Sequence, residues 1–192
     1  MPQPCSEALD FLLTRRSRPA KTLGEPVPGR EELEPILRAA LRSPDHGKLE
    51  PWRLIVLERA ALARLADLVA ARGPALGRTA EEVEKQRLPY AEAGLAVAVV
   101  FAPQQSPKIP EEEQLLSAGA VCMQLLNAAL AAGWGANWLT GWAVRDRAFL
   151  EDGLGLGGGE RVAGMIHIGT ERAAPPERPR PDMDAKVAWV TA

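Results

Sequence analysis

The residues best suited to chemistry near the start of the chain are Arg15, Arg16, Ser17 and Arg18. A guanidinium group presents its N–H donors in a planar fork that fits phosphate or carboxylate oxygens, a geometry that lysine does not match. The cluster is therefore a candidate anion site. The commoner use of such a cluster is a solvated surface or a network of salt bridges, and the residues alone leave both interpretations open.

A second group of hydrogen-bond donors lies in residues 42–52, which read RSPDHGKLEPW. Two prolines, a glycine and an aspartate favour a loop, on which Arg42, His46 and Lys48 place donors. The loop leads directly into residues 53–57, which have the pattern of a strand. A donor-rich loop between a helix end and a strand suits an anionic or heterocyclic ligand, although His46 is as well suited to capping the loop.

No pattern in the sequence indicates an acid–base pair, an activated nucleophile or a metal site. Residues 153–159 (GLGLGGG) lack the lysine and the serine or threonine of a P-loop, so they are interpreted as a flexible turn. His167 lies in an alternating apolar segment and is interpreted as a sheet residue. Cys5 and Cys122 are far apart, which favours neither a disulfide framework nor a metal site. The sequence therefore predicts no catalytic side chain and no metal.

Composition argues against two broad classes of partner. The 192 residues carry 23 Lys plus Arg against 25 Asp plus Glu, so a general binder of nucleic acid or acidic membranes is not indicated. No signal peptide opens the chain. The longest apolar run, residues 93–102, is about half of the ~20 residues that span a bilayer. We therefore expect a cytoplasmic protein with no nucleic-acid partner and no membrane partner.

The element that must organise these groups is the apolar segment at residues 114–132. Its leucines, valine and methionine point in too many directions for one amphipathic stripe, which is typical of a helix covered all round, in a core or at a subunit interface. Ser117, Gln124 and Asn127 share one face of this helix. Gly133 and Gly135 end it, and residues 137–141 are predicted to form a polar and aromatic corner.

The remaining elements fit one domain with a sizeable core. Hydrophobic periodicity predicts helices at residues 6–14, 30–42, 59–72, 79–88 and 145–152, and strands at residues 53–57, 94–102 and 161–169. Residues 171–181 hold four prolines and three arginines and suit neither a helix nor a central strand. Strand character returns at residues 185–191. An extended arm that ends in a strand suggests pairing with the sheet of a partner subunit.

Five sets of residues occur in a recognisable order along the chain. They are Arg15-Arg16-Ser17, residues 42–46 with 51–53, residues 117–119, Gly133 with residues 138–141, and residues 168–170. Together they resemble the FMN-dependent nitroreductase family, specifically its short, YdjA-like bacterial branch. The resemblance covers about residues 7–171.

The resemblance implies an α+β fold, a three-layer α-β-α sandwich with a mixed sheet flanked by helices. It implies an intertwined homodimer, in which residues 1–171 form the FMN-binding domain and residues 172–192 form an arm that crosses to the partner subunit. Two FMN sites are expected at the subunit interface.

Site residues follow from the same resemblance. The positions of Arg15, Arg16 and Ser17 hold the FMN phosphate and ribityl chain from one subunit, and those of Arg42 and His46 also contact FMN. The other subunit lines the flavin with Trp138, Leu139 and Thr140. A region associated with the nicotinamide nucleotide is formed by Ala128, Ala129, Leu130, Ala131, Ala132 and Gly133.

The activity that the resemblance implies is ping-pong oxidoreduction. Hydride passes from NADH or NADPH to FMN and then to a small-molecule acceptor, such as a nitro compound or a quinone, and the cofactor carries the chemistry. Two alternatives stay open. One is a flavin destructase or dehalogenase-like enzyme on the same fold, and the other is a non-catalytic flavin-binding or regulatory dimer.

Three positions depart from the family pattern. Pro19 stands where an arginine is common, with Arg18 and Lys21 as possible substitutes. Leu139 also replaces a usual arginine, and Glu50 stands where glutamine is usual, before Pro51-Trp52. These departures predict weaker FMN binding or an altered acceptor.

Overall fold

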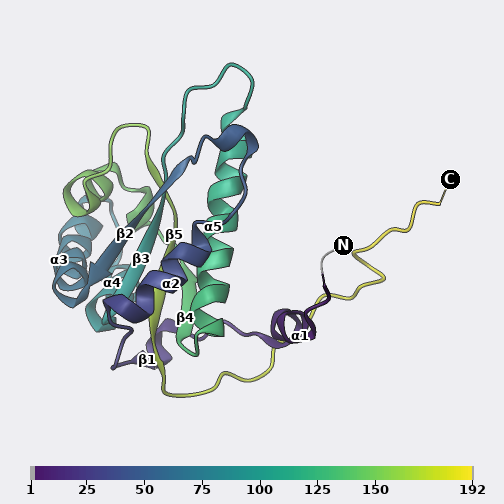
Figure 1. The fold of residues 1–192 in the computed structure, drawn as a ribbon. Coiled ribbons are helices and arrows are strands. Elements are labelled where there is room, and N and C mark those ends of the chain that lie inside the picture. Colours follow the sequence, from purple (N-terminus) through teal and green to yellow (C-terminus); the bar gives the residue numbers. More distant parts are fainter. Residues whose placement is uncertain (1–2, 192) are drawn as a thin grey trace.

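The computed structural model describes residues 3–191 as a sheet with helices on both faces and a long C-terminal arm (Figure 1). The helices are α1 (Ser6–Thr14), α2 (Arg30–Ala40), α3 (Arg59–Ala75), α4 (Ala80–Glu92) and α5 (Glu111–Ala131). The strands are β1 (Leu23–Gly24), β2 (Trp52–Glu58), β3 (Leu95–Phe101), β4 (Gly135–Leu139) and β5 (Arg161–Glu171). Short helical turns lie at Ala20–Thr22, His46–Lys48, Ala143–Arg145 and Phe149–Gly153.

The sheet has the order β1-β5-β3-β2, and β4 pairs with β5 beside β1. All four of these pairings among the described residues are antiparallel, where the resemblance implied a mixed sheet. Strand β3 lies between β2 and β5, and every one of its residues is buried. Burial on both faces explains why its sequence is a continuous apolar run, as predicted.

Alternate residues of the central strands feed two hydrophobic clusters. On one face, Ala96, Ala98 and Met165 pack with α3, α4 and the turns that precede β5. On the other face, Val97 and Ile166 pack with α2 and α5. Side chains alternate across a strand, so one sheet supplies both layers of contact. The α+β class and the three-layer sandwich are confirmed.

Helix α5 is covered on one side only. Its inner face is buried and carries Ala118, Val121, Cys122, Leu125, Leu126 and Ala129. Its outer face exposes Leu116 by 69% and Met123 by 41%. The described chain leaves this outer face uncovered, so coverage on all sides, predicted for a core or a subunit interface, stays a prediction there. By length and composition alone, α5 could cross a membrane, but the core helices of soluble proteins meet the same criterion. The inner face of α5 packs on the sheet.

The local predictions for β4, the short helix after it and β1 have different outcomes. The corner expected at residues 137–141 is largely strand β4, because the backbone of Gly135–Leu139 pairs with β5. The helix expected at residues 145–152 is formed at residues 147–154, with a π-helical segment at Phe149–Gly153 and a separate short turn at Ala143–Arg145 before it. Strand β1 was not predicted, since two residues carry no periodicity.

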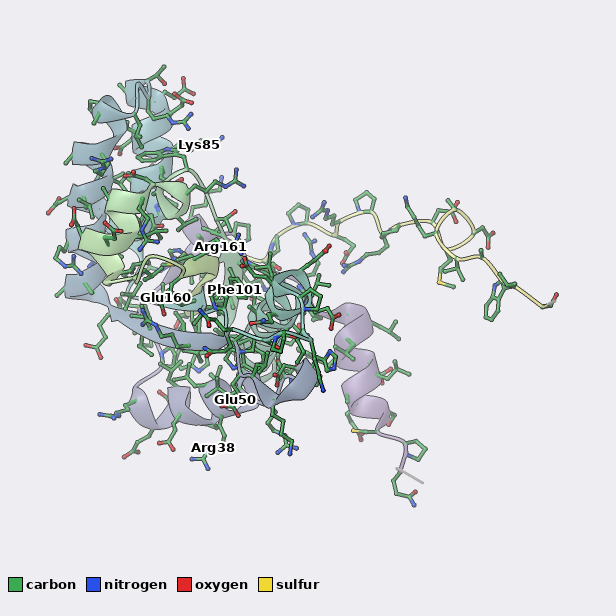
Figure 2. All side chains as sticks on the ribbon, turned by 90° about the horizontal axis from the view of Figure 1, so that it is seen from above. Arg38, Glu50, Lys85, Phe101, Glu160 and Arg161 are labelled. Atoms are coloured by element: carbon green, nitrogen blue, oxygen red, sulfur yellow. The ribbon has the colours of Figure 1, made fainter. Side chains whose placement is uncertain are left out.

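The glycine-rich residues 153–159 form a loop that polar side chains hold in place. Arg147 donates hydrogen bonds to the carbonyls of Leu156 and Gly157, at 2.7 and 2.6 Å. Glu160 accepts two from the guanidinium group of Arg53, at 2.6 and 2.8 Å. Figure 2 shows Glu160 close to Phe101 and Arg161. These internal contacts use the loop's own carbonyls and agree with a structural turn.

The arm after β5 extends away from the domain (Figure 1). The predicted strand at residues 185–191 is not formed in this chain, and these residues are exposed. Trp189 is 85% exposed and Val190 86%. The crossing of this arm to a partner subunit stays a prediction.

Candidate functional site

The segment that follows α1 is fastened to strand β4. The amide of Arg18 donates to the carbonyl of Ala136 at 2.8 Å, and the side chain of Asn137 donates to the carbonyl of Arg18 at 2.7 Å. These two bonds bring the predicted residues 15–17 beside the predicted residues 138–140. Groups about 120 positions apart in sequence thus form one site.

Side chains from both groups surround a surface depression of about 430 Å³. Its lining residues are Arg15, Ser17, Met123, Leu126, Trp138 and Thr140. A guanidinium N–H of Arg15 donates to the Ser17 hydroxyl at 3.1 Å, which holds the two polar groups together. Polar donors at one side and apolar side chains of α5 and β4 at the other suit a ligand that has both an anionic and an aromatic part.

The positive charge at this site is only partly neutralised, since Arg15 has no carboxylate partner among the described residues. The Nε atoms of Arg15 and Arg16 are buried and have no hydrogen-bond partner among the described residues. Burial lowers the pKa of Arg15, and the charges of Arg180, Arg16 and Arg18 lower it further. A buried donor without a partner is unfavourable. A phosphate group would supply both the missing acceptors and the missing negative charge, so the donor set fits FMN.

The structure adds one residue that sequence reasoning missed, Arg180. Arg16 donates to the carbonyl of Pro176 at 2.7 Å and lies 4.0 Å from Glu177, which draws the first part of the arm toward the cluster. Arg180 pairs with Glu177 at 3.2 Å and its charge reaches Arg15. The signal in the sequence that could have pointed to Arg180 is the alternation of arginine and proline at residues 178–181. Arg18, named above as a possible substitute for the arginine missing at Pro19, is paired with Glu171 at 2.9 Å.

Arg42 and His46 are not part of this depression in the same chain. His46 lies against the first turn of α5, with its Nδ1 2.9 Å from a carboxylate oxygen of Glu113. Leu126 is 13 residues further along the helix, about 20 Å at 1.5 Å per residue. Glu50 belongs to the same loop as His46 and has a positive φ of 47°. One chain therefore holds two separate parts of the predicted flavin site.

Leu139 and Thr140 border a second hollow, of about 460 Å³, against helix α4. Thr140 lines both hollows, which makes them neighbours. His167 lies in the wall of the second one, and burial lowers its pKa to about 4, so it is neutral at pH 7. Its Nδ1 has no partner within the described chain, and its ring meets that of Tyr90 edge-on. It remains a sheet residue, as predicted.

The segment assigned to the nicotinamide nucleotide, residues 128–133, forms the end of α5. Ala129 is buried in the core, whereas Ala131, Ala132 and Gly133 are exposed. Gly133 adopts a positive φ of 86°, which stops the helix. None of these six residues lines the depression, so their role stays a prediction.

Comparison with known proteins decides the family. The model of the nitroreductase family matches residues 13–170, which span both halves of the site. The chain belongs to the nitroreductase family. A relative in Escherichia coli (strain K12), provisionally named NAD(P)H nitroreductase YdjA, is 33% identical over 164 residues, 85% of this chain and 88% of the relative. A provisionally named NAD(P)H nitroreductase of Haemophilus influenzae is 36% identical over 165 residues, with the same coverage. The YdjA-like branch is thereby confirmed.

Solved structures of low identity share the fold of this nitroreductase family member. A nitroreductase-like family protein from Bacillus cereus has a TM-score of 0.77 at 22% identity, covering 99% of this chain and 98% of its own. A provisionally named nitroreductase from Desulfovibrio desulfuricans, solved in complex with FMN, has a TM-score of 0.73 at 20% identity, covering 100% of both chains. The nitroreductase fold is therefore shown over the whole chain.

One expectation about the site changes. The resemblance placed Arg15–Ser17 and Trp138–Thr140 on different subunits, but Arg15, Ser17, Trp138 and Thr140 line one depression of one chain. The reason is the pair of hydrogen bonds that joins Arg18 to β4. Arg42 and His46 of the same chain do not line this depression.

Proposed function

We propose that this nitroreductase family member is an FMN-dependent NAD(P)H oxidoreductase that works by a ping-pong scheme. The observation that carries the proposal is the pair of buried Nε atoms of Arg15 and Arg16, which have no hydrogen-bond partner among the described residues and lie near the apolar wall at Trp138. It is supported by the family match and by relatives named as NAD(P)H nitroreductases. The unpaired cysteines Cys5 and Cys122 suit the cytoplasm as its location.

Each part of the depression has a separate task. Arg15 and Arg16 bind the phosphate of FMN, with Ser17 as an additional hydrogen-bond donor and Arg180 as a further positive charge. Trp138, Met123 and Leu126 form the apolar wall and exclude water from the site. Thr140 lies where the two hollows meet and offers a hydroxyl to either of them.

The cofactor supplies hydride chemistry between a nicotinamide nucleotide and a nitro compound, quinone or similar acceptor. The chain's own contribution is to bind, to orient and to keep water out. This division of labour is consistent with a depression that contains no acid–base pair, since its lining residues are one arginine, two hydroxyl residues and three apolar side chains.

The same proposal includes a homodimer. The outer face of α5 exposes Leu116 and Met123, and an apolar helix face is stable only when it is covered. If two copies of α5 pack antiparallel about a two-fold axis, the start of one helix lies beside the end of the other. Arg42 and His46 of the partner subunit then reach the depression, whereas the same two residues of this chain lie away from it.

Arg15→Ala tests the phosphate assignment. Because Arg15 lines the depression, its loss should weaken FMN binding at least about tenfold, the equivalent of one charge-assisted hydrogen bond. Flavin absorbance after gel filtration of FMN-loaded protein measures the change. Arg38→Ala is the control, since Arg38 pairs with Glu34 on the exposed side of α2. Full retention of FMN by the Arg15 variant would contradict the assignment.

Anaerobic titration of the FMN-loaded protein with NADH and with NADPH tests the enzyme activity. Loss of the oxidised-flavin spectrum with either nucleotide, followed by its return on adding a quinone or nitro compound, is the expected result. Tight FMN binding without any reduction would instead favour the non-catalytic flavin-binding dimer.

A further inference from the structure

A third hollow continues the path that begins at the flavin depression. The depression and the second hollow meet at Thr140, and the second hollow shares Gly141 and Trp142 with a third one of about 410 Å³. Thr140 and Trp142 are two residues apart, which is at most about 7 Å of chain. The three hollows therefore form one run along the end of strand β4, and a single long ligand can occupy all of them.

The third hollow has a positively charged rim. Its lining includes three arginines, Arg78, Arg145 and Arg147, and a single carboxylate, that of Asp146. This carboxylate is already bound, because Arg72 donates hydrogen bonds to both of its oxygens, at 2.6 and 3.0 Å. The charge of the three lining arginines is therefore not cancelled by Asp146.

Two of these arginines are available to a ligand. Arg145 is exposed and forms no ion pair with any described residue. Arg78 makes a single long contact, 3.4 Å, with Glu82, and its guanidinium group lies over the ring of Trp142, 5.9 Å from the centroid. Arg147, by contrast, is held by the loop carbonyls described above. An anion in this hollow would therefore meet two guanidinium groups beside an indole ring.

We propose that Arg78 and Arg145 bind the 2′-phosphate of NADPH, and that this subsite makes NADPH the preferred electron donor. A guanidinium fork matches phosphate oxygens in geometry and in charge. NADPH carries this phosphate on its adenosine end, whereas NADH lacks it. The reacting nicotinamide ring lies at the other end of the molecule, so the nucleotide matches a run of hollows that is apolar at Trp138 and basic at Arg145. The inference rests on the oxidoreductase proposed above and names its donor.

The second hollow, between these two ends, suits the phosphates that link the two nucleotides. Lys85 of helix α4 lines it and is labelled in Figure 2. Glu82 lines it as well, but its carboxylate is occupied, since it accepts a hydrogen bond from the amide of Thr79 at 2.9 Å. The ammonium group of Lys85 therefore remains to bind an anionic linker.

The third hollow stays open in the proposed homodimer. Helices α3 and α4 cover one face of the sheet and α5 covers the other (Figure 1). The hollow is lined by Leu76 at the end of α3 and by Arg78 before α4, whereas the proposed dimer uses the outer face of α5. The nucleotide can thus enter from solvent without separating the subunits.

Arg145→Ala tests the subsite through the choice of donor. FMN-loaded protein is mixed anaerobically with NADPH or NADH at several concentrations, and the rate of flavin reduction gives an apparent Kd for each nucleotide. The wild type should bind NADPH at least about tenfold more tightly than NADH, and Arg145→Ala should remove this preference, the equivalent of one charge-assisted hydrogen bond. An unchanged ratio of the two constants in Arg145→Ala would overturn the proposal.

Arg87→Ala is the matched control on the same layer of the molecule. Arg87 lies on α4, lines none of the three hollows and is paired with Glu84 at 2.7 and 2.8 Å. Its loss removes a positive charge of the same kind close to the hollows, so the ratio of the two constants should stay that of the wild type. A loss of preference as large as that of Arg145→Ala would show a general effect of charge and overturn the subsite.

Binding of adenosine 2′,5′-bisphosphate separates this inference from the proposed function. The probe carries the phosphate but no nicotinamide ring, so its binding does not depend on flavin reduction. Calorimetric titration should show binding to the wild type and at least about tenfold weaker binding to Arg78→Ala and Arg145→Ala. Adenosine 5′-monophosphate should bind the wild type as weakly as the probe binds these variants.

The two measurements together distinguish the possible failures. If both nucleotides reduce the flavin equally well and the bisphosphate does not bind, the subsite is wrong and the oxidoreductase stands. If neither nucleotide reduces the flavin, the proposed function is wrong, and NADPH as the donor is wrong with it.

Discussion

The two faces of α5 have similar sequences and opposite surroundings. Leu125 on the inner face is fully buried against the sheet, and Leu116 on the outer face is 69% exposed. Both are leucines on the same helix, nine residues apart. The inner face is covered by this chain, and in the proposed homodimer the outer face is covered by a second one. An apolar pattern on a helix face therefore indicates that the face is buried in the assembled protein, but it does not indicate which chain buries it.

The same contrast separates the whole domain from its periphery. The sheet and its two clusters bury their apolar side chains within the chain. Helix α1 has no buried residue and exposes Leu9, Leu12 and Leu13, and the arm exposes Trp189. The candidate flavin site lies where these two regions meet. We infer that the core determines stability and that the periphery determines assembly and cofactor binding.

Leu125→Ala tests the inner face and should have the largest effect. Removing a buried leucine leaves a cavity and lowers the free energy of unfolding by about 2–5 kcal/mol. Denaturant unfolding at several protein concentrations measures it. The loss should be similar at every concentration, because the lost contacts lie within one chain. Leu116→Ala is the matched variant, and its loss should shrink at concentrations low enough to separate the subunits.

Leu116→Glu tests the outer face. A carboxylate in the covered interface would be buried without a partner, so the dimer dissociation constant should rise at least about a hundredfold. Sedimentation analysis gives the constant. Leu76→Glu, at a 42% exposed position on the opposite layer, should leave it unchanged. A Leu116→Glu chain that remains dimeric would show that the outer face of α5 is not the interface.

Much of the core was predictable because its signals are local. The continuous apolar run of β3 and the periodicity of α2 and α3 give the elements and their buried faces without knowledge of contacts. Helix α4 begins directly after Thr79, whose hydroxyl caps it by accepting from the amide of Glu82 at 3.2 Å. Strand β4 was missed because Asn137 and Thr140 suggest a corner, while its pairing with β5 depends on residues about 30 positions away.

The site was predictable in its residues and less so in its arrangement. The positions of Arg15 and Trp138 carry the family resemblance, but their meeting depends on bonds from Arg18 to β4 that no motif encodes. Arg180 was missed because proline-rich sequence predicts an arm without predicting where it turns. Long-range contacts of this kind are set by packing, which residue types alone do not specify.

The same comparison applies to ion pairs, where a partly buried pair is compared with an exposed one. Here the expected effect on the free energy of unfolding is the smallest. Hydrogen bonds from Arg53 lower the pKa of Glu160 to about 2, opposed by burial and assisted by the Gly157 amide and the charges of Arg53 and Arg147. The folded pKa lies below the ordinary 4.5, so the pair's stabilisation is present above that pH and is lost as the pH falls toward 2.

Glu160→Gln should therefore lower the free energy of unfolding by about 1 kcal/mol at pH 7 and flatten its decline between pH 4.5 and 2. Glu34→Gln removes an exposed pair on α2, in which the two side chains are 62% and 76% exposed, and should follow the wild type at every pH. Unfolding curves across this range measure both variants. If the wild type and Glu160→Gln lose stability equally as the pH falls, the Arg53–Glu160 pair stabilises the protein no more than the exposed pair does. Partial burial would then not strengthen ion pairs in this chain.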